Sequence, residues 1–260
     1  MPPSVRPPWP STFLGENHAG PRGQDLPWAP RSRCRLQAQM RIEGCEFPDD
    51  LLYDGEGLVW VRVEPSGELR LGITSIHAAI GGRLTKVAGK SVGVAYDLGR
   101  SIGTIEGGKY FGPIRTPITG VILEINPIVL DRPRTLSEAP YTDGWFARLR
   151  PTRWGEEHSV LHRARASKEA LHAQITSLKV RCFAAFPDYE LFEIGTECAA
   201  VLLKLDELLR TIHVGEVVHL VSDDLTAPIE MTRWSDRTGH PVVDTRREGN
   251  LFHFLVRKIS

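Results

Sequence analysis

The sequence has no run of about 18 apolar residues, the length that a membrane-spanning helix needs. It also has no excess of charge of either sign, because 32 lysines and arginines are balanced by 32 aspartates and glutamates. A chain without a positive field over its whole surface has no general attraction for nucleic acid or for an acidic membrane. We therefore expect a soluble protein with neither of these partners. Its 260 residues are enough for two domains of ordinary size.

Cysteine is also scarce. The four cysteines, Cys34, Cys45, Cys182 and Cys198, lie far apart and form no C-x-x-C pair. A chain of this length does not need disulfides to hold a small core together. We expect reduced thiols and a cytoplasmic location.

Residues 1–39 are rich in proline and arginine and contain no apolar core of the kind that a secretory signal needs. This composition predicts a disordered tail. Because Met40 opens the first regular pattern of the chain, we also consider that translation starts there, in which case the tail is not made.

Residues 40–155 have the pattern of an all-β domain. The stretches "LVWVRVE", "ELRLGIT" and "GVILEIN" alternate or are apolar, and glycine or proline punctuates the segment about every ten residues. A last strand is expected in "APYTDGWFARLRP". Short strands with regular turns predict a flattened barrel or sandwich.

Residues 156–186 predict a helical linker. Apolar residues fall at spacings of three and four from Leu161 to Leu178, which indicates one long amphipathic helix. His158 and His162 lie four apart on this helix, but two ligands are too few for a metal site, and we expect no metal.

Residues 187–260 predict a small two-layer α/β sandwich of order β-α-β-α-β-β. "YELFEI" and "EVVHLVS" are strands, and "CAAVLLKLDELLRTI" is a helix. The second helix is expected to have Thr226 at its N-cap, Pro228 in its first turn and Gly239 at its end. A hairpin turning near Gly249 and Asn250 closes the chain.

Two motifs resemble catalytic ones without their context. "GRSIG" at Gly99–Gly103 matches the G-x-S-x-G pattern, but that serine works only where a strand turns sharply into a helix, and we expect a strand after Ser101. "GGRLTKVAGKS" has six residues between Gly82 and Gly89 where a phosphate-binding loop needs four. We expect no catalytic residue.

Lys109 follows two glycines in "TIEGGKYFGPIRTPITG". Gly107 and Gly108 remove side chains beside the lysine and permit the positive φ of a tight turn. The ammonium would then stand clear at a hairpin tip, where the alternative is an ordinary solvated charge.

The β region, from about Asp50 to Pro151, resembles the glycine cleavage system H protein, a lipoyl-domain family. The matching stretches are "LLYDGEGLVWVRVE", "LRLGIT", E-x-x-K at Glu106–Lys109, P-x-x-G at Pro117–Gly120 and "APYTDGW". The resemblance implies that Lys109 carries lipoate in amide linkage, with Glu106, Gly107 and Gly108 shaping the tip. It implies a non-catalytic carrier, loaded by a lipoate ligase or lipoyl-assembly enzymes.

The context of the lysine, "EGGKYFGP", differs from the usual "ESVKA" of H proteins. It is similar to the H-protein-like lipoate-binding proteins of sulfur oxidation, which implies a heterodisulfide-reductase-like partner complex. The alternatives are a carrier of the aminomethyl group for glycine-cleavage enzymes and an unmodified scaffold. Dihydrolipoyl dehydrogenase is a further possible partner of a lipoyl carrier.

Residues from about Tyr189 to Lys258 resemble the TusA-like sulfur carriers. The resemblance makes Cys198, at the start of the first helix, the candidate sulfur acceptor, although the family's C-P-x-P is Cys198-Ala199-Ala200-Val201 here. A helix N-terminus favours a thiolate, whereas Glu197 opposes it by its charge. The alternative is a packed thiol in a docking domain.

Overall fold

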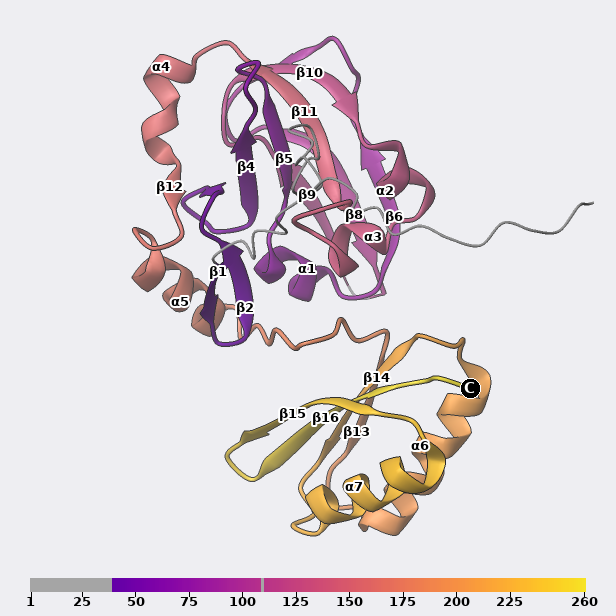
Figure 1. Ribbon diagram of the computed structural model, residues 1–260. Coiled ribbons are helices and arrows are strands. Elements are labelled where there is room, and N and C mark those ends of the chain that lie inside the picture. The colour runs from indigo at the N-terminus through magenta and orange to yellow at the C-terminus, as the bar shows by residue number, and fades with distance from the viewer. Residues whose placement is uncertain (1–38, 109) are drawn as a thin grey trace, which may run out of the picture. The chain divides into compact units, whose positions relative to one another are not determined.

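The structure is a computed structural model that describes residues 39–108 and 110–260 (Figure 1). The expected tail, apart from its last residue, lies outside the described residues, as does Lys109. No helix in the described part of the chain is long and apolar enough to cross a membrane.

The first domain is built of antiparallel strands, as the alternating segments predict. Its strands are β1 (Gln39–Ile42), β2 (Cys45–Pro48), β3 (Leu52–Tyr53), β4 (Val59–Val63), β5 (Leu69–Ile73), β6 (Leu84–Gly89), β7 (Ala95–Tyr96), β8 (Ser101–Gly107), β9 (Phe111–Arg115), β10 (Gly120–Ile125) and β11 (Trp145–Pro151). One sheet has the order β12-β3-β4-β5-β11-β10-β7, in which β12 (His162–Arg163) comes from the linking segment, and another has the order β6-β8-β9. Strands β1 and β2 form a separate hairpin.

The two larger sheets share one apolar core. Side chains from both, such as Leu71, Ile105 and Phe146, are fully buried in it. Gly103 of β8 leaves room for Phe146, since a Cβ there would lie 2.2 Å from the ring. Ser101 opens strand β8 and is not at a strand-to-helix turn, so the serine-nucleophile pattern lacks its required context.

Three short helices interrupt the β region and were not expected from the sequence: α1 (Ser75–Gly81), α2 (Pro127–Asp131) and α3 (Thr135–Glu138). Helix α1 begins after Thr74, whose hydroxyl accepts the His77 N–H at 3.4 Å. It ends at Gly82, which has a φ of 63°. The N-cap and the glycine are local helix signals, but seven residues are too few to show a periodicity.

The linking segment differs from the single long helix expected there. It contains α4 (Trp154–Glu157), the 3-10 turn η1 (His158–Val160), strand β12 (His162–Arg163) and α5 (Lys168–Ser177). Leu161 has extended dihedrals, and β12 pairs with β3. Leu161, Ala164, Leu171 and Ile175 are all buried, as the apolar spacing predicts, whereas Leu178 at the end of the series is 43% exposed. The spacing of three from Leu161 to Ala164 fits a short strand and turn as well as a helix.

The C-terminal domain has the expected order. Its elements are β13 (Tyr189–Glu193), α6 (Cys198–Thr211), β14 (Val217–Ser222), α7 (Ala227–Thr238), β15 (Val242–Glu248) and β16 (Leu251–Arg257). The sheet order is β13-β14-β16-β15, and both helices lie on one face of it (Figure 1). Thr226 occupies the N-cap position of α7, and Gly239 ends that helix with a φ of 78°. The two-domain fold class is therefore confirmed.

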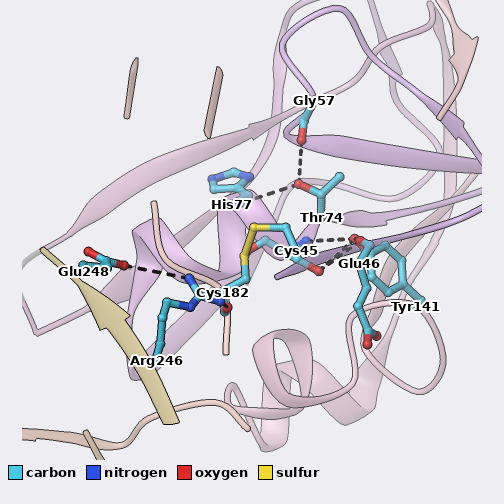
Figure 2. Close-up of a disulfide and its surroundings, with 10 residues drawn as sticks. Cys45, Glu46, Gly57, Thr74, His77, Tyr141, Cys182, Arg246 and Glu248 are labelled. Atoms are coloured by element: carbon cyan, nitrogen blue, oxygen red, sulfur yellow. Dashed lines mark hydrogen bonds and ion pairs between the residues drawn. A yellow bond between two sulfur atoms is a disulfide. The ribbon is translucent and has the colours of Figure 1, made fainter. Parts of the chain in front are cut away.

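Cys45 and Cys182 form a disulfide, so the prediction of reduced thiols is wrong for this pair (Figure 2). They are 137 residues apart, and folding brings the end of the linking segment against β2. Gly44 permits this approach, because a Cβ there would lie 2.3 Å from the Cys182 carbonyl oxygen. Local sequence patterns carry no information on a pairing over this separation. Cys34 lies outside the described residues, and Cys198 is a free thiol.

Candidate lipoyl-attachment turn and sulfur-acceptor cysteine

The hairpin expected around Lys109 is formed by β8 and β9. Its last strand pair is Glu106 with Phe111, and the Gly107 N–H donates to the Tyr110 carbonyl at 2.8 Å. We call Gly107, Gly108 and Tyr110, with Lys109 between them in the sequence, the β8–β9 turn. The lysine itself lies outside the described residues, and its neighbours define the site.

The two glycines of the β8–β9 turn have different roles from those expected. Neither has a φ in the left-handed region, so positive φ is not the reason for glycine at either position. A Cβ on Gly107 would lie 2.1 Å from the Gly81 carbonyl oxygen at the end of α1, so Gly107 allows close approach of two backbones. A Cβ on Gly108 would meet nothing within 4 Å.

The exposed part of the site fits a lysine-borne group. Gly108 and Glu106 are both exposed, and Phe111, beside the turn, is 71% exposed. The open space around Gly108 gives a modifying enzyme access to the backbone next to Lys109.

Tyr110 connects the turn to helix α1. Its hydroxyl lies 3.3 Å from His77 Nε2, and the two rings meet edge to face with centroids 6.1 Å apart. The side chain can fold back over β9 because the next-but-one residue is Gly112, where a Cβ would lie 2.1 Å from the Tyr110 hydroxyl oxygen. Together with the Gly107–Gly81 approach, this contact holds both arms of the turn against α1.

Burial sets the protonation of this contact. His77 is 1% exposed, and burial lowers its pKa to about 4. Burial also raises the pKa of Tyr110. At neutral pH a neutral imidazole therefore faces a neutral phenol, and the hydrogen bond carries no net charge. Neither His77 nor Gly112 stood out in the sequence, and only the glycine after an aromatic residue on a strand could have signalled a close approach.

The Pro117–Gly120 turn, part of the motif that carried the resemblance, is held by helix α4. The Glu157 carboxylate accepts the Thr119 N–H at 2.6 Å and the Thr119 hydroxyl at 2.7 Å. This turn leads directly into β10. Glu157 is a supporting residue that sequence reasoning placed in the linker and assigned no role.

A cavity of about 1140 Å³ lies beside the β8–β9 turn. Gly108 and Tyr110, on the two sides of Lys109, contribute to its wall. Ser75 of α1 and Cys182 of the disulfide contribute elsewhere on the same wall. The site and the disulfide therefore share one cavity.

Cys198 begins helix α6, as the sequence predicts, but its thiol is not activated. The side chain is only 5% exposed. Its N–H donates to Asp224 Oδ2 at 2.8 Å, so a carboxylate of the chain already occupies this helix N-terminus. Burial, followed by the charges of Asp224 and Glu230, raises the pKa of Cys198 to about 11. These effects outweigh the expected stabilisation of the thiolate by the helix.

Asp224 also organises the start of α7. Its Oδ1 accepts the Thr226 N–H at 2.8 Å and the Thr226 hydroxyl at 2.7 Å. These bonds, with that from Cys198, lower the pKa of Asp224. Asp224 thus ties the N-termini of the two helices together, a role that the sequence alone did not suggest.

The comparisons with known proteins match both parts of the chain. Residues 51–174 match the family model for glycine cleavage H-protein, and residues 190–258 match that for sulfurtransferase TusA. The glycine cleavage system H protein 5 of Aquifex aeolicus (strain VF5) is 35% identical over 145 residues, which are 54% of this chain and 97% of that protein. The probable glycine cleavage system H protein 2 of Sulfolobus acidocaldarius is 34% identical over 140 residues, 53% of this chain and 93% of that protein.

A solved structure, that of a glycine cleavage system H protein from Mycobacterium marinum, is 30% identical and covers 47% of this chain and 98% of its own, with a TM-score of 0.42. The relatives are matched over nearly their whole length, and the TusA match begins beyond the end of the H-protein match. The chain therefore belongs to the glycine cleavage H-protein family and carries a TusA-like domain C-terminal to its H-protein domain.

Proposed function

We propose that this chain is a lipoate-bearing carrier protein, with the lipoyl group in amide linkage to Lys109. The observation that carries the proposal is the β8–β9 turn, where Gly108 has open space around it and Glu106 is exposed on the strand before it. Membership of the H-protein family supports it, because the members of this family carry covalently attached lipoate.

The group, once bound, supplies a dithiolane that can be reduced or loaded. The residues of the chain present Lys109 to a lipoate ligase or to lipoyl-assembly enzymes and later to partner active sites. Gly107 and Tyr110 hold the turn against α1, so that the turn has one defined shape. The chain acts as a carrier, and its own side chains supply no acid–base chemistry.

We further propose that the arm carries sulfur or redox equivalents for a heterodisulfide-reductase-like complex. The fusion supports this, because the TusA family match adds a sulfur-carrier type of domain to a lipoyl type of domain in one chain. The burial of Cys198 and its raised pKa favour a docking role for the second domain over persulfide transfer.

A second candidate is the transfer of the aminomethyl group in glycine cleavage. It is favoured by the names of the relatives, which are glycine cleavage system H proteins. A reconstituted assay separates the two: transfer of glycine-derived methylamine to the lipoylated chain supports this candidate. Loss of sulfur-compound oxidation in a deletion strain supports the first one.

Mass spectrometry of the intact protein and its peptides, purified from its native cells, tests attachment directly. We expect a lipoyl adduct on Lys109 and its absence in Lys109→Arg, because a guanidinium is not acylated by such a ligase. An unmodified Lys109 in cells that lipoylate their other proteins would contradict the proposal and favour the alternative of an unmodified scaffold. Function retained by Lys109→Arg would refute the carrier role.

A further inference from the structure

We propose that the Cys45–Cys182 disulfide is redox-active and is reduced by a dithiol that enters the cavity beside the β8–β9 turn. The two families matched by this chain and the roles proposed above assign no function to this bond. The chain's own arm can supply the dithiol only if Lys109 is lipoylated, and in that respect the inference rests on the proposed function.

The first argument is that the fold does not need the bond as a staple. The β domain and the C-terminal domain each have a separate buried core, built around residues such as Phe146 and Trp234. Disulfides are concentrated in small domains that cannot build such a core. In a chain of 260 residues, a bond between distant segments calls for another explanation.

The second argument is access from one side. Cys182 contributes to the wall of the 1140 Å³ cavity and is 8% exposed, whereas Cys45 is fully buried and does not line the cavity. The cavity therefore offers an attacking sulfur an approach to Cys182 and none to Cys45. This asymmetry fixes which sulfur is attacked and which one leaves.

The third argument is proximity to the β8–β9 turn. Cys182 Sγ lies 3.6 Å from the Ser75 carbonyl oxygen, and Tyr110 contacts His77 two residues further along α1. Since a helix rises about 1.5 Å per residue, the disulfide and the turn contact positions within one turn of the same helix. Figure 2 shows His77 and the disulfide in one close-up.

The fourth argument is electrostatic. Arg246 Nη2 donates to the Cys182 carbonyl at 2.8 Å, and Arg181 precedes Cys182 in the sequence. Figure 2 shows Arg246 beside the disulfide. Positive guanidinium groups near a cysteine favour the thiolate that attacks or is released. The carboxylate of Glu248 pairs with Arg181 at 2.7 Å and lies 4.0 Å from Arg246, so it partly offsets the positive charge of both guanidinium groups.

The exchange balances as a two-electron step. One thiolate of the dithiol attacks Cys182 Sγ, the bond to Cys45 breaks, and the electron pair leaves on Cys45 Sγ, which takes a proton. The second thiol of the reductant then attacks the mixed disulfide on Cys182, releases that cysteine as a thiol and closes the reductant into a cyclic disulfide. Two electrons and two protons reach the protein, and the dithiol is oxidised.

The experiment uses the full-length Lys109→Arg protein, which has no arm, and dihydrolipoamide as the probe. Opening of the disulfide is followed by alkylation and peptide mass spectrometry of Cys45 and Cys182. We expect opening in the folded protein, and slowing by about tenfold when Ala184→Trp narrows the cavity that Ala184 lines. Ala200→Trp, an exposed alanine outside this cavity, is the matched control and should open at the unchanged rate.

A trapping experiment tests the asymmetry. With oxidised lipoamide, the thiol left in Cys45→Ser, which is Cys182, should form a mixed disulfide, whereas Cys45 in Cys182→Ser should form none. Failure of dihydrolipoamide to open the bond in the folded protein, equal rates in the two tryptophan variants, or an adduct on Cys45 alone would each overturn the proposal.

A final comparison identifies the source of the dithiol. Lipoylated wild-type protein is treated with dihydrolipoyl dehydrogenase and NADH without free dithiol, beside Lys109→Arg as the control. If the disulfide opens in the lipoylated protein and not in Lys109→Arg, the lipoyl group on Lys109 supplies the dithiol. If only free dihydrolipoamide opens it, the chain's own arm is excluded as the source, but the disulfide is still redox-active. If Lys109 carries no lipoyl group, the proposed function fails while the first experiment still decides the disulfide.

Discussion

Tyr110 is the described neighbour of Lys109 with the most specific contact, the hydrogen bond to His77 on α1. Tyr110→Phe removes the hydroxyl and leaves the buried His77 Nε2 without this partner. We expect a loss of about 1–2 kcal/mol in the free energy of unfolding. Because the turn is then held less firmly, we also expect slower lipoylation by a ligase in vitro.

Urea unfolding and the initial rate of lipoylation, read by mass spectrometry, measure the two effects of Tyr110→Phe. Tyr96→Phe is the matched control, since Tyr96 is a half-buried tyrosine on β7, a strand that pairs with β10. Equal losses in the two variants would contradict a specific role for the Tyr110–His77 contact.

Cys198 offers a second test, at a helix N-terminus. Because Asp224 is one cause of the raised pKa of this thiol, Asp224→Asn should lower that pKa from about 11 and increase alkylation at pH 8 by several-fold. Iodoacetamide labelling against pH gives the measurement. Asp223→Asn is the control, because Asp223 accepts the Gly195 N–H at 2.8 Å and does not contact Cys198 N–H. Equal labelling of both variants would show that burial alone suppresses the thiol.

Helix α4 supports the Pro117–Gly120 turn through a single side chain, Glu157. Glu157→Ala leaves the buried Thr119 without an acceptor for its N–H and hydroxyl, and we expect a loss of about 2 kcal/mol in the free energy of unfolding. Glu156→Ala, the exposed neighbour on the same helix, should change stability by less than about 0.5 kcal/mol. Thermal unfolding compares the two variants, and similar melting temperatures would argue against this bond.

The elements that the sequence predicted well are those with both a period and a local stop signal. Helix α7 has its N-cap position at Thr226 and its end at Gly239, and β15 and β16 turn at Gly249. The linking segment has the apolar spacing of a helix but no local signals that mark where a helix ends, and it folds into α4, η1, β12 and α5. A strand of two residues such as β12 exists because β3 pairs with it, and pairing with a distant strand leaves no local trace.

The candidate site also has a part that the sequence predicted and a part that only the folded structure reveals. Its position on a hairpin follows from the alternation and the glycines around Lys109. The partners of that hairpin, His77 and the Gly81 carbonyl, belong to a helix too short to show a period. The reason for Gly107, close backbone approach, also becomes visible only when α1 is in place.

Acid sensitivity is a property that both domains share. Burial lowers the pKa of His77 and of His219 from 6.5 to about 4, with the charge of nearby His253 as the second cause for His219. Between pH 6.5 and 4 the unfolded chain binds a proton at each histidine that the folded chain does not. The free energy of unfolding is therefore highest above pH 6.5. For each histidine it falls by about 1.4 kcal/mol per pH unit as the pH drops through this window.

Urea unfolding at pH 7.5 and pH 5 measures this loss. His77→Gln should have a smaller difference between the two pH values than wild type, because glutamine does not titrate. The exposed His213, changed to glutamine, is the control and should keep the wild-type difference. An unchanged pH dependence in His77→Gln would exclude His77 as a source of the acid sensitivity.

Arg134, next to α3 in the β domain, joins a charge network with carboxylates at the edge of the C-terminal domain. Its guanidinium pairs with Asp188 and, at 3.2 Å, with Glu216, and both carboxylates are almost fully buried. Burial raises the pKa of Asp188, and the bonds from Val217 N–H and Arg134 offset this only in part. For Glu216, the His213 N–H and Arg83 outweigh burial and lower the pKa.

Arg134→Met should therefore cost about 2–4 kcal/mol of unfolding free energy at pH 7, since it leaves a buried carboxylate of Asp188 without its cation. Arg132→Met is the matched control, because Arg132 is exposed and its ion pair is with Glu138, which is itself partly exposed. The cost of Arg134→Met should shrink toward pH 4, where a raised pKa lets Asp188 take up a proton and lose its charge. Unfolding curves of both variants at pH 7 and pH 4 test this, and a cost independent of pH would mean that packing of the arginine stem, and not its charge, stabilises the contact.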